Sequence, residues 1–324
     1  MINSYLFIIL SIKIFTTLIY DRNLGDLMKK GPSLYPKKKS RSNKKILFIN
    51  GKLLVTGLFI LVLCTLILMN IPYENPPLAT GLEVSSSPNY KITIVDNSTG
   101  GDVSSNTVLM DNLNQTPVTM EVVEAAKQGT PMIVLGDGSR PRIMLVAGVH
   151  GGELPPQLAA LNLINELNGE KIKGTVYIIP FAIPINTATG NRTPNNSDPD
   201  RVAHNPGTPL NNIINTSLQC DVTLLVDFHS AQPNDIPGKN CIIYYPQNNK
   251  SQELAQYVGN RTGSPLVEVG PYPGVLSTVS NQNGITSVVC EVLSPHNKTD
   301  PGSVNLSYQY MNAFLDYSGV YKAD

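Results

Sequence analysis

The feature that most constrains the fold is an apolar run followed by a glycine-rich turn and then by a helical pattern. Ile143–Val146 is continuously apolar and predicts a buried strand, and the apolar residues of Leu154–Leu167 recur at helical spacing. His150 and Glu153 lie in the turn between them. In an α/β protein, such a turn at the carboxyl end of a strand can offer an imidazole nitrogen and a carboxylate to one metal ion. A plain turn, with an incidental histidine and a glutamate that favours the helix N-terminus, explains the same residues.

Strand-like and helix-like segments alternate from residue 90 onwards. Strands are predicted at Tyr90–Val95, Met132–Leu135, Arg142–Val146, Gly174–Ile179, Val222–Val226, Cys241–Tyr245, Leu266–Val269 and Ser287–Val292. Helices are predicted at Val118–Gln128, Leu154–Leu167, Glu253–Arg261, Val275–Asn281 and Val304–Tyr317. This alternation predicts one α/β domain, residues 90–324, built on a mixed, mostly parallel sheet with helices on both faces.

Two further predicted strands lead into residues that can bind a metal ion or transfer a proton. Val222–Val226 runs into His229, and the strand that begins at Ser287 runs into Glu291. Because the carboxyl ends of parallel strands share one edge of a sheet, His150, Glu153, His229 and Glu291 are expected to meet there. Asp227 lies two residues before His229, and strand alternation places both side chains on one side, so Asp227 is expected to orient His229 rather than bind metal.

Three motifs now resemble a known family. GVHGGE (148–153), DFHS (227–230) and VCE (289–291) are similar, in the same order, to the motifs of the succinylglutamate desuccinylase/aspartoacylase family, relatives of the zinc carboxypeptidases. The resemblance covers about residues 132–293. It implies that His150, Glu153 and His229 bind one Zn²⁺ per chain and that Glu291 is the general base. Gly151 and Gly152 are then expected to form the bend that lets both ligands face one ion.

The segment between the first two motifs resembles the family more loosely. The match implies that Arg192 polarises the scissile carbonyl and that Arg201 holds a carboxylate of the substrate. The planar fork of the Arg201 guanidinium suits a carboxylate. Asp200 stands where the family has Asn, and Ala203 begins the sequence AHNPG where the family has Phe-Pro-Gly. These departures bear on substrate recognition more than on metal binding.

An uncharged run, Leu53–Ile71, is long enough to cross a bilayer as a helix. Residues 1–45 form an apolar run, interrupted by Lys13, and a basic segment; 46–71 are predicted as the transmembrane helix and 72–89 as a linker. Of the 24 Lys and Arg, 11 lie in residues 1–71, against only 2 of the 24 Asp and Glu. The short basic segment is expected to stay in the cytoplasm, which places the 90–324 domain outside it. The first apolar run is either a second span or a segment upstream of a start at Met28.

A cleavable signal peptide fits Leu53–Ile71 less well, because the run is long and lacks a small-residue cleavage site. The basic balance belongs to this anchor, and nothing indicates nucleic-acid binding. Asn191 and Asn195 are expected to be unglycosylated because a glycan would obstruct the cleft. His204 and His296 lie in polar loops and are expected to be solvated rather than metal ligands, although either can touch substrate from the rim of the site.

The sequence therefore predicts a membrane-anchored, extracytoplasmic zinc-dependent hydrolase that cleaves an amide bond in a peptide or acyl-amino acid with a free carboxylate. The alternative is a surface binding or adhesion domain that keeps the hydrolase fold without turnover. The departures at Asp200 and Ala203 leave room for this alternative.

Overall fold

The computed structural model describes residues 82–86, 89–192, 197–270 and 272–322. Contacts divide the chain into two compact units, Met1–Pro72 and Tyr73–Asp324, and all described residues belong to the second. The predicted transmembrane helix and the segments before it lie outside the described residues. Within the described part, no helix combines the length and the apolar character that crossing a bilayer requires.

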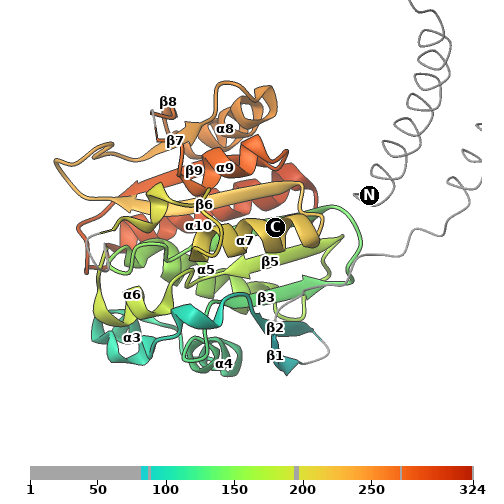
Figure 1. Cartoon of the computed structure of the whole chain (residues 1–324), viewed down its shortest axis with the longest axis vertical. Coiled ribbons are helices and arrows are strands. Elements are labelled where there is room, and N and C mark those ends of the chain that lie inside the picture. The colour runs from blue at the N-terminus through green and yellow to red at the C-terminus, as the bar shows by residue number, and fades with distance from the viewer. Residues whose placement is uncertain (1–81, 87–88, 193–196, 271, 323–324) are drawn as a thin grey trace, which may run out of the picture. The chain divides into compact units, whose positions relative to one another are not determined.

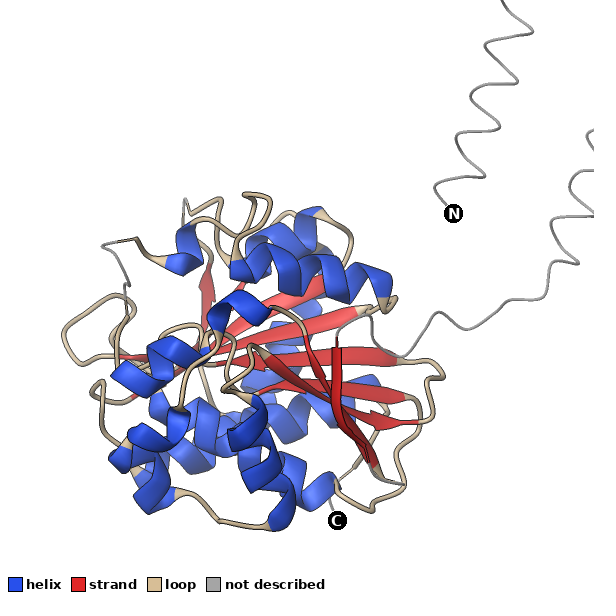
Figure 2. Ribbon diagram, turned by 60° about the horizontal axis from the view of Figure 1, so that its bottom comes forward, coloured by secondary structure: helices blue, strands red, loops and turns tan. Residues whose placement is uncertain are grey.

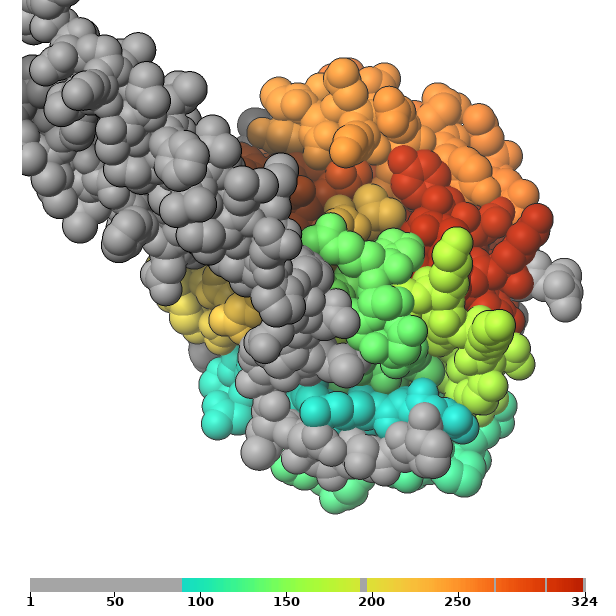
Figure 3. Space-filling model, turned by 90° about the vertical axis from the view of Figure 1, so that its right-hand side faces the viewer, coloured from blue at the N-terminus to red at the C-terminus, as the bar shows by residue number. Residues whose placement is uncertain are grey.

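A nine-stranded sheet forms the middle of this unit, in the order β1-β2-β3-β5-β4-β6-β9-β7-β8 (Figure 1). The strands are β1 (Leu82–Ser86), β2 (Tyr90–Ile94), β3 (Pro131–Gly136), β4 (Arg142–Ala147), β5 (Thr175–Ile179), β6 (Leu224–Ala231), β7 (Cys241–Tyr244), β8 (Leu266–Glu268) and β9 (Thr286–Leu293). In Figure 3 the cyan segment, which includes β2, lies low on the face shown and the orange segment that contains α8 (Asn249–Thr262) lies at the top, in keeping with the two ends of this strand order.

The sheet is mixed, as predicted, but it is not mostly parallel. The central strands β5, β4, β6 and β9 are mutually parallel, whereas four of the eight pairings, those of β1–β2, β2–β3, β3–β5 and β7–β9, are antiparallel. The turn between β3 and β4 and the loop between β6 and β7 each reverse the chain without a crossover helix, which fixes the direction of β3 and β7. Hydrophobic patterns carry no information about strand direction, so this part was not predictable from them.

Helices cover both faces of the sheet, as predicted (Figure 2). One buried cluster joins the sheet to helices through Leu158, Leu254 and Phe314, and the other does so on the opposite face through Ile213 and Val279. The other helices are α3 (Thr107–Asn112), α4 (Pro117–Ala125), α5 (Leu154–Leu167), α6 (Pro184–Thr189), α7 (Pro209–Gln219), α9 (Leu276–Gln282) and α10 (Pro301–Ser318), with short 3₁₀ turns at Asn97–Thr99, Val103–Ser105 and Pro199–Arg201.

Local signals set the ends of the helices that frame the site. α5 begins directly after Glu153 and carries two prolines in its first turn, where missing N–H groups cost nothing. α10 begins after Asp300, whose carboxylate accepts a hydrogen bond from the Gly302 N–H, and it ends at Gly319 with φ 71°.

Two elements differ from the prediction in ways that matter for the site. β6 extends to Ala231, so His229 lies within the strand rather than after it. β1 lies inside residues 72–89, which the sequence assigned to a linker, and pairs with β2. The sheet of this domain therefore begins earlier than its alternating pattern indicated.

Candidate metal centre

The predicted metal ligands meet at the carboxyl edge of the parallel strands. β4 ends at Ala147 and the following turn carries His150 and Glu153, while the neighbouring strand β6 carries His229. The ladder between β6 and β9 places His229 directly opposite Glu291. Residues that are far apart in the sequence thus reach one site because their strands are neighbours.

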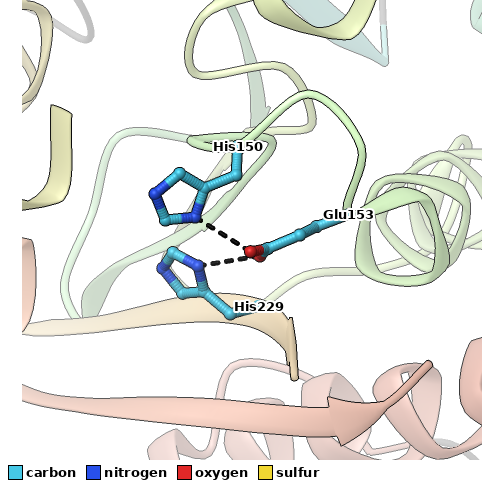
Figure 4. A group of neighbouring side chains, drawn as sticks. All are labelled: His150, Glu153 and His229. Carbon is cyan, nitrogen blue, oxygen red and sulfur yellow. Dashed lines mark hydrogen bonds and ion pairs between the residues drawn. The ribbon is translucent and has the colours of Figure 1, made fainter. Parts of the chain in front are cut away.

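The Glu153 carboxylate lies between the two imidazoles (Figure 4). His150 Nδ1 is 2.9 Å from Glu153 Oε1, and His229 Nδ1 is 2.9 Å from Glu153 Oε2. The three side chains are buried, and their ligating atoms all lie within 4.8 Å of one another. Glu153 Oε2 also accepts a hydrogen bond from the Ser230 N–H at 3.0 Å, which fixes the orientation of the carboxylate.

Two further carboxylates face the outer nitrogens of the imidazoles. Asp198 Oδ1 is 2.9 Å from His150 Nε2, and Asp227 Oδ1 is 3.0 Å from His229 Nε2. Carboxylates in this position hold a histidine with Nδ1 free to bind a metal. The structure places Asp227 where strand alternation predicted it. Asp198 was not singled out from the sequence, although it begins the DPDR segment (198–201) that was compared with the family.

Burial and the neighbouring histidines act in opposite directions on the pKa values of two carboxyls of the site, and the histidines outweigh burial. Burial opposes ionisation of Glu153, but the positive histidines on either side hold the pKa of its carboxyl well below the usual range. Burial likewise opposes ionisation of Asp198, and its hydrogen bond with His150 outweighs this and lowers the pKa. Both carboxylates are therefore ionised at neutral pH and attract a cation.

A glycine makes the close packing of this turn possible. A Cβ added to Gly151 would lie 1.7 Å from the backbone oxygen of Asn186, so no larger residue fits there. The residue of this turn with a left-handed backbone is Gly148, whose φ is 75°; Gly151 and Gly152 do not have a positive φ. A Cβ on Gly152 would lie 3.1 Å from both Asn297 Oδ1 and the backbone oxygen of Gly190, which is tight but not a collision, so the bend depends on Gly148 and Gly151 more than on Gly152.

The two predicted arginines border the site. Arg192 Nη1 is 2.6 Å from Glu153 Oε1 and 3.2 Å from His150 Nδ1, and its side chain remains 40% exposed. Arg201 donates a hydrogen bond to the backbone oxygen of Asp200 at 2.7 Å, and its guanidinium lies over the ring of Tyr272, 4.4 Å from the centroid. This stacking holds the positive charge of Arg201 at the mouth of the cleft.

Glu291 lies in the same cleft. Its Oε2 is buried and has no hydrogen-bond partner among the described residues. Burial raises the pKa of Glu291 to about 8, so the group holds a proton more readily than an exposed glutamate. A buried carboxyl with a raised pKa beside a candidate metal centre has the properties of a group that exchanges protons with substrate or water.

The cleft has a volume of about 780 Å³ and joins the metal ligands to an apolar wall that includes Ile243, Val267 and Val269. His296 also lines it; its side chain is 18% exposed and its Nε2 is 3.3 Å from Ser230 O, so it lies at the rim of the site rather than wholly in solvent. His204 is exposed, as expected.

The donor set fits zinc. Two imidazole nitrogens and one carboxylate are the ligands of catalytic zinc sites, which keep a further position open. Here both Nδ1 atoms and the Glu153 carboxylate converge, and outer carboxylates orient both imidazoles.

Known structures share the architecture of this chain. An aspartoacylase family protein from Mesorhizobium loti superposes with a TM-score of 0.53 at 17% identity, over 75% of this chain and 71% of that one. The chain has the aspartoacylase-type fold. The product-bound ectoine utilization protein EutE (DoeB) from Ruegeria pomeroyi gives a TM-score of 0.51 at 21% identity, over 62% of this chain and 65% of that one.

These matches confirm the fold that the sequence motifs implied. The chain spans less than two thirds of the Ruegeria protein, and the identities are low, so the activity has to be argued from the site itself. Neither the family models nor the curated proteins that were compared match the chain.

Proposed function

We propose that this protein is a zinc-dependent hydrolase that cleaves an amide bond. The observation that carries the proposal is the convergence of His150, Glu153 and His229, each fixed by a further contact on the side away from the shared centre. Preorganised ligands of this kind bind metal tightly because little side-chain freedom is lost on binding. A structural role alone would not require two buried imidazoles to face the same carboxylate.

The residues of the chain can be assigned roles in such a reaction. A zinc ion in this site would supply a Lewis acid that lets water act as a nucleophile near pH 7. In its ionised form, Glu291 takes the proton of the attacking water and returns it to the leaving amine. Arg192, partly exposed beside the ligands, stabilises the negative charge that develops on the carbonyl oxygen.

The substrate is an acyl-amino acid or peptide with a free carboxylate. Arg201 is one of two exposed arginines in the cleft, and unlike Arg192 it makes no short contact with the metal ligands; its guanidinium, stacked on Tyr272, can bind a carboxylate. The apolar wall of the cleft accommodates the uncharged part of the substrate.

We further propose that the domain works outside the cytoplasm, anchored by the predicted span Leu53–Ile71. The support is the uncharged length of this run and the basic residues that precede it. A protease-accessibility assay on intact cells tests this placement, because an extracytoplasmic domain is digested without lysis.

The test of the catalytic proposal uses the full chain in detergent. Metal analysis is expected to find one zinc per chain, and Glu291→Gln is expected to retain that zinc and lose turnover on a panel of acyl-amino acids and peptides. Glu268→Gln is the matched control, since Glu268 is an exposed glutamate that lines the same cleft. Equal turnover of Glu291→Gln and the natural protein, or no bound metal, would favour a non-catalytic binding domain.

A further inference from the structure

A buried carboxylate lies directly beside the exposed arginine of the cleft. The side chain of Asp200 is only 9% exposed, yet it lines the cleft together with Arg201. Its Oδ1 accepts a hydrogen bond from the Leu276 N–H at 3.0 Å. Its Oδ2 is 3.7 Å from Arg201 Nη1. The same Nη1 donates a hydrogen bond to the backbone oxygen of Asp200 rather than to this carboxylate. One oxygen of Asp200 therefore remains available beside the guanidinium.

A second buried carboxylate adds to the negative charge at this point. Asp200, Asp227 and His229 bring their polar atoms within 4.8 Å of one another. Asp227 is fully buried, and its Oδ2 has no hydrogen-bond partner in the described part of the chain. Like charges this close in a protein interior repel each other, and the imidazole of His229 can balance at most one of the two, so a positive group placed between the cleft and Asp200 would be bound favourably.

The charges that line the whole cleft agree with this. Two arginines, Arg192 and Arg201, face six carboxylates: Glu153, Asp198, Asp200, Asp235, Glu268 and Glu291. Even with Glu291 left out because it holds a proton readily, the five other carboxylates exceed by one the combined charge of the two arginines and one divalent metal ion. A substrate that carried only a carboxylate would meet an attractive arginine within an otherwise repulsive cleft.

We propose that Asp200 and Arg201 together recognise a zwitterionic amino-acid end of the substrate, with its carboxylate on Arg201 and its ammonium on Asp200. The inference rests on the proposed function for the bond that is cleaved. If the α-ammonium is free, the scissile amide is formed by a side-chain group, as in an ω-N-acyl diamino acid or a γ-linked glutamyl amide. The substrate class is thereby narrowed from acyl-amino acids in general to side-chain-linked amides.

Binding of three probes that cannot be hydrolysed tests the proposal. Norleucine carries the zwitterion, hexanoate only the carboxylate and hexylamine only the ammonium, all on a comparable apolar chain. In calorimetric titrations of the zinc-loaded full chain at pH 7.5, norleucine of one enantiomer is expected to bind about tenfold or more tightly than hexanoate and hexylamine, as for one charge-assisted hydrogen bond.

Asp200→Asn keeps the size of the side chain and an oxygen for the Leu276 N–H, and removes the charge. It is expected to weaken norleucine binding about tenfold and to leave hexanoate binding unchanged or stronger. Asp235→Asn, which removes an exposed carboxylate from the same cleft, is the control and is expected to leave the preference for norleucine intact.

Two results would overturn the proposal: hexanoate binding at least as tightly as norleucine to the natural protein, or an unchanged preference in Asp200→Asn. Absence of binding by all three probes would count equally against it. A preference for norleucine that depends on Asp200, without hydrolysis of any ω-N-acyl diamino acid or γ-glutamyl amide, would refute the proposed function and leave this recognition standing. Hydrolysis of such an amide without the Asp200-dependent preference for norleucine would support the proposed function and refute this recognition.

Discussion

Asp200 should make the metal-free protein less stable as the pH rises. Burial, followed by the nearby charge of Asp227, raises the pKa of Asp200 from its ordinary value of 3.8 to about 6. In the unfolded chain the carboxyl loses its proton near pH 4, whereas in the folded protein it keeps the proton until about pH 6. The folded state therefore binds more protons between these values, and its free energy of unfolding falls as the pH rises through this window.

The size of the effect follows from the difference in pKa. A difference of about two units corresponds to about 3 kcal/mol, a cost that is absent below pH 4 and fully present above pH 6. Asp200→Asn removes the ionisable group but keeps an oxygen for the Leu276 N–H. The variant is therefore expected to be more stable than the natural protein by up to about 3 kcal/mol at pH 7.5 and to match it near pH 4.

Urea unfolding of both proteins with a chelator, at several values between pH 4 and pH 8, measures this difference. The charges of His150 and His229 lower the pKa of Asp200 and partly offset its cost, so the comparison measures Asp200 together with its coupling to these histidines. The free energy of unfolding of Asp235→Asn should change with pH in parallel with that of the natural protein over the same range. Parallel curves for Asp200→Asn as well would refute the reasoning, because they would show that ionised Asp200 carries no cost in the fold.

Three further outcomes are expected. Glu291→Gln should lower turnover by about 10²- to 10⁴-fold while zinc content is unchanged, since only the proton transfer is lost; an assay on zinc-quantified protein checks this, and a parallel loss of zinc would contradict it. Asp198→Asn should weaken zinc affinity by about 10- to 100-fold in a chelator competition, because His150 loses the carboxylate that orients it; unchanged affinity would contradict that role. Gly151→Ala should abolish zinc binding because its Cβ would collide with Asn186 O at 1.7 Å, whereas Gly152→Ala, whose nearest contacts are at 3.1 Å, should retain zinc by metal analysis.

The sequence predicted the ligand-bearing elements because their signals are local. The apolar periodicity of Leu154–Leu167 matches α5 residue for residue, and the continuous apolar runs before His229 and Glu291 are strands of the sheet core. Buried parallel strands read as unbroken hydrophobic runs, so their carboxyl ends can be located without knowing their order.

The parts that escaped prediction depend on contacts between distant segments. α7 (Pro209–Gln219) is rich in Asn, which is a poor helix former, and its helical state depends on burying Leu210, Ile213 and Ile214 against the sheet. Asp198 lies in a polar loop, and only its 2.9 Å contact with His150 gives it a role. No local pattern reports such a contact.

The negative charge of Asp200 can be explained either by the fold or by a bound molecule, and the contacts of its carboxylate distinguish the two. Its structural contact is the hydrogen bond accepted from the Leu276 N–H, which an uncharged amide oxygen would also accept. The negative charge strengthens that contact, but burial and the nearby Asp227 outweigh the gain and raise the pKa of Asp200. A buried charge that weakens the fold is explained by a partner outside the fold; within reach are His229, which would be neutral with a metal ion bound, Arg201, and whatever occupies the cleft beside them. Because Arg201 donates its short hydrogen bond to the backbone of Asp200 and stacks on Tyr272, the charge of Asp200 is left for a cation of the bound molecule.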